Sequence, residues 1–409
     1  MRIEDTPEEA AFRREARAWL AANARPRTGT DADESVLRHH TPEAEAAHFE
    51  RCRAWQRRLY EGGFAALTWP ESVGGRGLTA AHQIVFHEEM RAFDCTTGFL
   101  ASIIALVGPA LLAYGTEEQR RHYVPRLLSG DDVWCQLFSE PDAGSDLANL
   151  RARAEDAGDA WIVNGQKLWT TGAQYSDLGL LLVRTNPDAP KHAGITCLVA
   201  DVRAPGVDVR PLVTSTGGVH FNEVFFRDVR VPKADVLGEV DGGWAVARTT
   251  LANESVMIGT SAIGTRDVDA LAALARTAGR LDDADTRERL ARVYLNERIL
   301  ELFRTRMQAA VRAGRTPDVD GSVLKVFWAE SRAFKDAVAL DLLGADGLLD
   351  GADAPAEGYW QGQYLDFPMG TIGGGTCEVH RNGIGERVLG LPREPREDRT
   401  TPFRALRRA

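Results

Sequence analysis

QLFSEPDAGSD, residues 136–146, lies where helical sequence gives way to strand sequence. Before it, TPEE (6–9) and TEEQ (116–119) carry the N-cap residue and the third-position Glu or Gln of helix starts. From about residue 133, β-branched and aromatic segments alternate with turn residues, and helical periodicity returns between DGG (241–243) and Leu389. This order predicts an α+β, mainly α-helical fold with a separate central sheet, because a doubly wound parallel sheet needs strands and helices to alternate.

The same transitions divide the 409 residues into four segments. We expect an N-terminal helical domain at 1–131, a central β domain at 132–238, a C-terminal helical bundle at 239–391 and a tail at 392–409. No GxGxxG motif follows a predicted strand, which argues against a Rossmann dinucleotide site. In the tail, acidic residues dilute the arginines between 393 and 408, which is typical of a solvated segment.

Composition and charge exclude several classes of protein. Hydrophobic residues make up 44% of the chain and charged residues 26%, as in globular proteins. The net charge of -10 argues against nucleic-acid binding, which needs unopposed Lys and Arg. The five cysteines are scattered without a CxxC pair, so we expect neither disulfides nor a metal site. The apolar run 97–114 is broken by Gly108 and Pro109, which indicates a core helix and no membrane contact. Because the N-terminus lacks a signal-peptide pattern, we expect a cytoplasmic protein.

Two loops could bind an anion or another polar group. In 136–146, Ser139, Ser145 and the backbone of a Pro-Gly loop could approach a ligand closely, although an ordinary turn explains the same residues. In TIGGGTCEVHRN (371–382), a glycine loop opens a helix, and a helix start presents unpaired amides to an anion. A Gly-rich linker is the alternative for this second loop.

The strand pattern around Asn164-Gly165 predicts a β-hairpin at that dipeptide. Just beyond it, Trp169 and Thr171 are two residues apart, so they would share one face of a strand. An indole beside a hydroxyl suits a flat conjugated ring. A tryptophan in a strand is usually a core residue, which is the alternative.

Glu254 falls within an apolar helical stripe. The stripe consists of Trp244, Ala247, Leu251, Ile258 and Ala262. A carboxylate on a helix face that packs against the core must be paired with another polar group or have a functional role. Burial would raise the pKa of Glu254 and make it basic enough to remove a proton from carbon. A buried salt bridge to an arginine explains the same spacing equally well.

Together these segments resemble the acyl-CoA dehydrogenase family, nearly from end to end. SEPDAGSD (139–146), NGQKLWTTG (164–172) and GGGTCEVHRN (373–382) are similar to three of its motifs, in the same order. The resemblance implies an N-terminal helical domain, a central β-barrel-like domain and a C-terminal four-helix bundle. It also implies FAD bound between subunits, and hence a homo-oligomer, either a dimer or most often a homotetramer, that works in lipid metabolism.

The resemblance also implies roles for individual residues. Those expected to contact FAD are Gln136, Phe138, Ser139, Ser145, Trp169, Thr171, Thr376 and Glu378. Those expected along the acyl thioester are Ser145, Asn253, Gly374 and Gly375. Many members carry the catalytic carboxylate where this chain has Gly374, whereas a branch similar to isovaleryl-CoA and long-chain dehydrogenases carries it ten residues before a helix glycine. Glu254 and Gly264 match that branch, so Glu254 is the expected base.

The implied reaction is α,β-dehydrogenation of an acyl-CoA, or of a carrier-bound acyl thioester, to the 2-enoyl thioester. Glu254 would remove the α proton while the β hydrogen leaves as hydride to the flavin. An electron-transfer flavoprotein would accept the electrons. The alternatives are a flavin-dependent monooxygenase of the same fold and a catalytically degenerate subunit that completes the flavin site of an active relative.

Three departures from the family bear on the flavin site. Ser255 replaces an arginine that usually follows the helix carboxylate. RTAGR (276–280) replaces the Arg-x-Phe-Gly segment that reaches a partner subunit's flavin, and Asp341 opens DLLGA (341–345) where a Gln-x-x-Gly-Gly segment is usual. An acid facing phosphates would be unfavourable. By contrast, Gly373 and Gly374 would leave room in the pocket for a branched or cyclic acyl group.

Overall fold

The computed structural model describes residues 4–27, 41–261, 267–315, 321–395 and 400–406, without the side chains of 254–261 and 352. These residues form two compact units, one made of 5–254 with 394–409 and the other of 1–4 with 255–393. Helix α6 (Gly243–Ser261) crosses the boundary between them. Among the described residues, no helix is both long and apolar enough to cross a membrane.

The first unit begins with a group of helices. Their bounds are α1 Pro7–Asn23, α2 Pro42–Glu61, α3 Ala80–Met90, α4 Gly98–Tyr114 and α5 Glu117–Ser129. Both expected capping boxes are present, at the starts of α1 and α5, so the sequence signals for these two helix starts are confirmed. The apolar run expected to be a core helix is α4, which lies mostly in the core.

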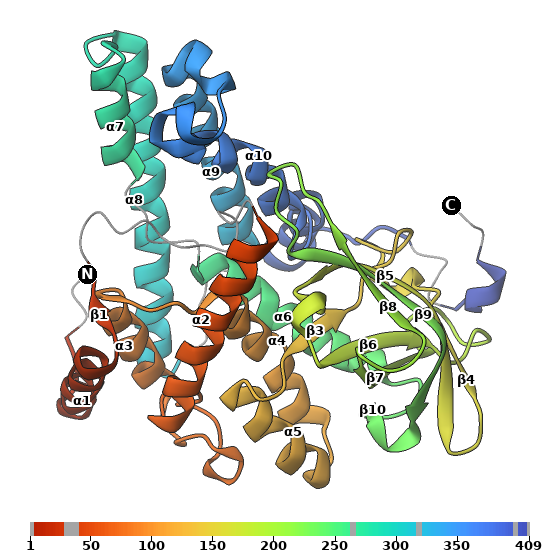
Figure 1. Ribbon diagram of the computed structural model, residues 1–409. Helices are drawn as coiled ribbons and strands as arrows, with labels where there is room; N and C mark the ends of the chain where they lie inside the picture. The colour runs from red at the N-terminus through yellow and green to blue at the C-terminus, as the bar shows by residue number, and fades with distance from the viewer. Residues whose placement is uncertain (1–3, 28–40, 262–266, 316–320, 396–399, 407–409) are drawn as a thin grey trace. The chain divides into compact units, whose positions relative to one another are not determined.

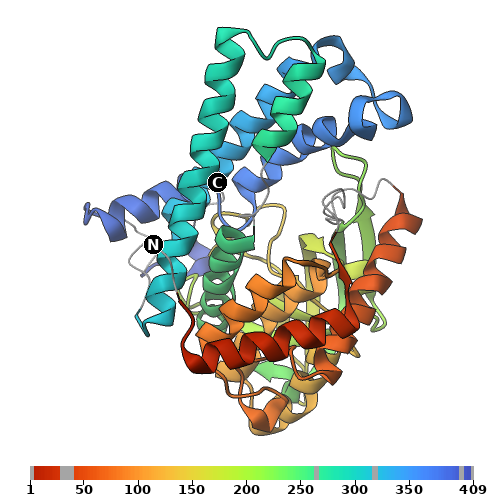
Figure 2. The ribbon, with the colours of Figure 1, turned by 90° about the vertical axis from the view of Figure 1, so that its left-hand side faces the viewer.

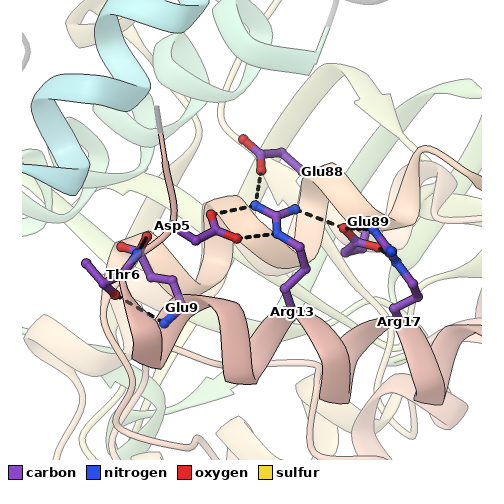
Figure 3. A network of polar contacts seen from close by, with 7 residues as sticks. All are labelled: Asp5, Thr6, Glu9, Arg13, Arg17, Glu88 and Glu89. Atoms are coloured by element: carbon purple, nitrogen blue, oxygen red, sulfur yellow. Dashed lines mark hydrogen bonds and ion pairs between the residues drawn. The ribbon is translucent and has the colours of Figure 1, made fainter. Parts of the chain in front are cut away.

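A network of ion pairs joins α1 to α3 (Figure 3). Arg13 donates to Asp5 at 2.5 Å, to Glu88 at 2.8 Å and to Glu89 at 2.9 Å. Arg17 donates to the same Glu89 at 2.7 Å. Because Glu89 is buried and receives both guanidinium groups, its pKa is lowered although burial alone would raise it. The network therefore fixes α1 across the surface of α3.

The second layer of this unit is a β sheet (Figure 1). Its strands are β3 Trp134–Leu137, β4 Arg153–Asp156, β5 Ala160–Thr171, β6 Leu178–Arg184, β7 Ile195–Asp201, β8 Val207–Leu212, β9 Phe221–Pro232 and β10 Val236–Leu237. The order is β10-β7-β6-β4-β5-β9-β8, with β3 paired in parallel to β6. Two-residue strands β1 Arg25–Pro26 and β2 Phe93–Asp94 form a separate pair. The predicted central sheet is confirmed.

The hairpin predicted at Asn164-Gly165 is wrong. Strand β5 runs straight through the dipeptide, and its pairing with β9 shifts register between Val163 and Gly165. Gly165 is needed there because a Cβ atom would lie 2.5 Å from the Cβ of Ala152. The dipeptide therefore forms a bulge inside a strand. The actual hairpin joins β4 to β5, and its turn lies at residues 157–159.

One hydrophobic core lies between the helices and the sheet of the first unit. Val107 and Leu111 of α4, Leu127 of α5, Trp134 of β3 and Leu180 of β6 are fully or almost fully buried in it. Side chains of α5 also reach the sheet edge, where Gln119 donates to the backbone of residues 234 and 236 at 2.9 Å. The helices therefore hold the sheet from one side.

The second unit is helical. Besides the end of α6, its helices are α7 Asp267–Thr277, α8 Ala284–Arg312, α9 Gly321–Leu343, α10 Tyr359–Ile372 and α11 Cys377–Gly383. Figure 2 shows α7 running back along α8 from the short connection at residues 278–283. The core of the unit is formed by Leu271, Val293, Val338 and Trp360, one from each of four helices. The predicted C-terminal helical bundle is confirmed.

A chain of buried charges crosses this bundle. Lys335 lies 2.5 Å from Asp267 and 3.4 Å from Asp336. Arg332 lies 3.5 Å from Asp336 and 2.6 Å from Asp366. Each buried carboxylate thus has a cationic neighbour, as burial of charge requires.

Glu297 of α8 gives this bundle a pH-dependent stability. Burial, together with the Asp267 carboxylate, raises the pKa of Glu297 from 4.5 to about 7. The folded state therefore holds a proton that the unfolded chain releases, and stability falls as the pH rises from 4.5 towards 7. We expect Glu297→Gln to stabilise the protein at about pH 8 by roughly 1–2 kcal/mol, allowing for partial exposure, and to change little near pH 5.

The measurement is the thermal unfolding midpoint of both proteins at the two pH values. Glu288→Gln, an exposed change on the same helix, is the matched control. An equal shift of the midpoint at both pH values would contradict the role given to Glu297.

Residues 400–406 are not part of the solvated tail that charge predicted, whereas residues 392–395 are exposed as expected. Phe403 stacks on the Arg184 guanidinium, whose carbon lies 3.9 Å from the ring centroid. The backbone N–H of Phe403 donates to Ala189 at 2.9 Å, and that of Arg404 donates to Pro187 at 3.0 Å. The segment therefore packs on the loop between β6 and β7 (Figure 1). Charge counting missed it because one aromatic residue and backbone hydrogen bonds make the contact.

Candidate functional site

A buried ion pair holds the loop that follows β3 in place. Lys167 of β5 is fully buried and lies 2.8 Å from Glu140. Its ammonium also donates to the Phe138 carbonyl at 3.0 Å. The Glu140 carboxylate accepts two backbone N–H groups, from Arg151 at 2.6 Å and Ala152 at 2.9 Å. Both ends of the loop are thus tied to one buried pair.

A second buried cation supports the far end of the same loop. Arg184 donates to the carbonyls of Ala148 at 2.7 Å and Lys191 at 2.6 Å, and burial lowers its pKa to about 10. Lys191 in turn binds the Asp146 carboxylate at 2.8 Å. These contacts hold the loop in one shape, as a site that receives a ligand without rearrangement requires.

The residues expected to contact FAD from this loop differ in exposure. Ser145 is exposed, and Gln136 and Ser139 are partly buried. The Phe138 side chain is buried in the core. Its carbonyl accepts from Lys167, and that of Ser139 accepts from Leu168 at 2.8 Å. The side chain and the carbonyl of Phe138 are therefore both engaged within the protein.

Trp169 lies on a distorted part of β5. Its backbone has φ of 59°, in the left-handed region that a tryptophan adopts only under strain, and the pairing with β9 shifts register between Lys167 and Thr170. The side chain is 58% exposed, and its ring meets the edge of Phe221 at 5.7 Å. The indole is thus exposed and in contact with Phe221, and it is not a core side chain.

The bulge also changes the relation of Trp169 to Thr171. Simple alternation predicted one shared face, but a strand with a register shift does not alternate regularly. Thr170 between them is buried, while Thr171 is partly buried and lines a small cavity with Gly172. The two side chains are therefore positioned by the bulge and not by a regular pleat.

Helix α6 carries the expected base. Gly243, Val246, Ala247 and Thr250 on its first turns are buried against the first unit's core. The Asn253 amide donates to the carbonyl of Thr249 in its own helix, at 2.8 Å. The side chains of Glu254 and Ser255, and Gly264, lie outside the described residues. Their expected roles stay predictions.

The glycine loop of the second unit opens a helix, as expected. Thr376 is the N-cap of α11 and accepts the Val379 N–H at 3.2 Å. Gly374 and Gly375 have φ of 66° and 91°, which glycine adopts without strain. Glu378 is exposed, and its pKa is lowered mainly by hydrogen bonds to the backbone and Thr376. The Thr376 hydroxyl is therefore engaged in capping.

Two of the three departures from the family pattern lie against each other. Arg280, from the altered 276–280 segment, donates to Asp341 at 3.0 Å, and Arg289 donates to it at 2.7 Å. Burial would raise the pKa of Asp341, but these two partners lower it. One carboxylate thus meets two guanidinium groups. Asp283 and Asp285 also lie 3.8 Å from Arg280 and Arg289, respectively, so the cluster holds three carboxylates against two guanidinium groups. The expected unfavourable effect of Asp341 on phosphates stays a prediction.

Sequence reasoning missed the groups that shape the site. Lys167 and Glu140 lie within two of the motifs that resemble the family. The signal that could have identified them is a charged residue within a run that is otherwise typical of a strand or a turn. Glu45 and His48 of α2, which line the cavity beside Thr171, gave no signal, because a helix that starts with Pro42 and several acids reads as solvated.

Comparisons with known proteins agree across most of the chain. Residues 6–131 match the N-terminal domain of acyl-CoA dehydrogenases, 135–229 the middle domain and 241–389 the C-terminal domain. The chain is 39% identical over 387 residues to the acyl-CoA dehydrogenase IpdE1 of Mycobacterium tuberculosis, covering 94% of this chain and 98% of that one. It is 35% identical over 411 residues to FadE26 of the same organism, covering 97% and 100%.

Solved structures agree with this fold. The Tcur3481-Tcur3483 steroid ACAD superposes with a TM-score of 0.78 at 30% identity, covering 96% of this chain and 100% of that one. The ChsE4-ChsE5 complex from Mycobacterium tuberculosis gives 0.74 at 32%, covering 96% and 100%. With its helical, sheet and helical segments in the family's order, the chain belongs to the acyl-CoA dehydrogenase family and is a flavoprotein oxidoreductase of that family.

Proposed function

We propose that the protein is an FAD-dependent dehydrogenase that converts an acyl-CoA, or a carrier-bound acyl thioester, to the 2-enoyl thioester. The observation that carries the proposal is the exposed, strained Trp169 beside a rigid loop in a chain of this family. Strain and exposure in one aromatic residue are typical of a ligand platform.

The residues present fit a flavin. The indole of Trp169 offers a flat face, and Ser145 and Thr171 offer hydroxyls. In the second unit, Arg280 and Arg289 pair with Asp341, so this carboxylate does not stand alone beside a phosphate. The other expected contacts, Gln136, Ser139, Thr376 and Glu378, belong to this proposal. When bound, FAD supplies the acceptor for the hydride from the β carbon.

Glu254 is the proposed base. It would remove the α proton of the thioester, and the apolar stripe around it would keep the carboxylate poorly solvated and therefore basic. Asn253, Gly374 and Gly375 would lie along the thioester and hold it in register with the base. Since Gly373 and Gly374 carry no side chain, a branched or cyclic acyl group would fit. The similar Tcur3481-Tcur3483 protein is named a steroid ACAD, and a steroid is a bulky cyclic compound.

An oligomer with an external electron acceptor completes the proposal. Leu295, Ile299 and Leu302 follow each other at helical spacing on α8 and are all exposed, which suits contact with another subunit. A homotetramer is one proposed form of this oligomer. A hetero-oligomer with a related chain is the other proposed form, and it is supported by ChsE4-ChsE5, which is named as a complex of two proteins. An electron-transfer flavoprotein is the proposed acceptor.

An anaerobic titration of the purified protein with acyl-CoA thioesters tests the function. Bleaching of bound flavin is the expected result, with cyclic acyl groups more effective than short straight chains. Oxygen consumption with hydroxylated product would instead identify the flavin-dependent monooxygenase. A purified protein that holds no FAD until a related subunit is added would identify the degenerate-subunit alternative.

A further inference from the structure

Residues 184–191, which we call the connection because they link β6 to β7, contact three parts of the first unit that are distant in sequence. The first is residues 139–146, here called the site loop, which Lys191 reaches through an ion pair. The second is the start of α6. The third is the C-terminal segment 400–406. A change in the connection would therefore reach the site loop and α6 together.

On one side, the connection holds the site loop. Arg184 is 4% exposed and donates to the Ala148 carbonyl at 2.7 Å, just beyond the loop. Lys191 binds the Asp146 carboxylate at 2.8 Å. Ser145, whose hydroxyl is proposed to contact FAD and the thioester, directly precedes Asp146. The position of that hydroxyl therefore depends on the connection.

On the other side, the connection holds the start of α6. Asp241 lies two residues before this helix, and its carboxylate accepts from the Thr185 hydroxyl and from the Asn186 amide, the latter at 3.2 Å. Gly243, the first residue of the helix, approaches β7 so closely that a Cβ atom would lie 2.5 Å from the strand backbone. The helix whose sequence carries Glu254 thus starts from a fixed point beside the connection.

The C-terminal segment covers the connection through Phe403. The Arg184 guanidinium carbon lies 3.9 Å from the centroid of this ring. The acceptors that Arg184 has are backbone carbonyls, which carry no full charge, and its buried Nε has no acceptor among the described residues. A cation held out of water by neutral groups gains most from an aromatic face. Residues 400–406 lie beyond the ranges that match the three family domains.

We infer that Phe403 is a positioning residue, which by covering Arg184 keeps the connection in the arrangement that places both the site loop and the start of α6. This inference rests on the proposed dehydrogenase function, in which the site loop contacts FAD and α6 carries the base. Without the aromatic ring, water competes for the guanidinium, and Arg184 holds its carbonyl partners less firmly. The site loop then loses the support that keeps its shape ready for a ligand.

The test compares Phe403→Leu with the wild type, both as full-length protein with FAD bound. Leucine keeps an apolar cover but removes the aromatic face. We expect amide hydrogen exchange to become about tenfold faster in peptides covering 139–150 and 241–250, and FAD to dissociate about threefold faster or more, as followed by flavin fluorescence. Phe403→Trp keeps an aromatic face and should restore most of both effects.

Arg404→Gln is the control, because it removes an exposed ion pair with Asp188 from the same segment and should leave both measurements unchanged. Peptides from α3, in the same unit, should exchange at the wild-type rate in every variant. A role in overall stability alone would instead speed exchange in α3 as much as in 139–150, and that result would overturn the inference.

Unchanged exchange at 139–150 and 241–250 in Phe403→Leu, FAD dissociation at the wild-type rate, or a wild-type protein that holds no FAD would each also overturn it. Flavin bleaching by an acyl-CoA is read separately in the same samples. Its absence beside faster exchange and faster FAD dissociation in Phe403→Leu would refute the dehydrogenase function but not the positioning role.

Discussion

Glu254→Gln is expected to slow the reduction of bound flavin by an acyl-CoA about 100- to 10,000-fold, with FAD still bound. Glutamine keeps the size of the side chain but cannot take the α proton, and without that step the β hydrogen cannot leave as hydride. The measurement is the anaerobic rate of flavin bleaching after rapid mixing with the thioester, alongside the ratio of FAD to protein.

Glu288→Gln makes the same chemical change at an exposed position of α8 and should bleach at the wild-type rate. If Glu254→Gln also bleaches at the wild-type rate, another group is the base. If the variant loses FAD, Glu254 contributes to FAD binding, and the bleaching rate then does not establish a catalytic role.

Lys167→Met is expected to destabilise the folded protein by about 3–5 kcal/mol, because it leaves the Glu140 carboxylate buried without its cation. The Arg151 and Ala152 amides still donate to that carboxylate, but they carry no charge. Loosening of the 139–146 loop should also lower the FAD content. Thermal unfolding and the flavin-to-protein ratio measure the two effects.

Lys233→Met removes a cation that pairs with Asp156 in an exposed position, so it should change stability by less than about 1 kcal/mol. The double variant Lys167→Met with Glu140→Gln should recover part of the stability, since no unpaired charge is then buried. A single Lys167→Met variant as stable as Lys233→Met would contradict this account.

Local signals predicted much of the fold. The capping residues at Thr6 and Thr116 mark real helix starts, and the glycines before Thr376 open a helix, because each signal acts within a few residues. The order of helices and sheet also followed from periodicity, which reports the burial of each segment. These features need no knowledge of distant parts of the chain.

The failures share a physical cause. At Asn164-Gly165, pairing with β9 overrides a strong local turn signal. Strand β9 follows some sixty residues later, so the dipeptide by itself carries no information about this pairing. Trp169 is exposed, but its exposure comes from a bulge and not from regular alternation. The sequence also gave no sign of the partners of Asp341, because Arg280 and Arg289 reach it only after folding.

Phe403 on Arg184 has a consequence for dissecting the protein. The β domain is continuous in space but not along the chain. Residues 400–406, which follow the whole helical bundle in sequence, pack on it. A fragment cut from 132 to 238 would leave that cation without its aromatic cover and the 187–189 backbone without its partners. A β domain that folds by itself would therefore need residues 400–406 joined to it through a linker.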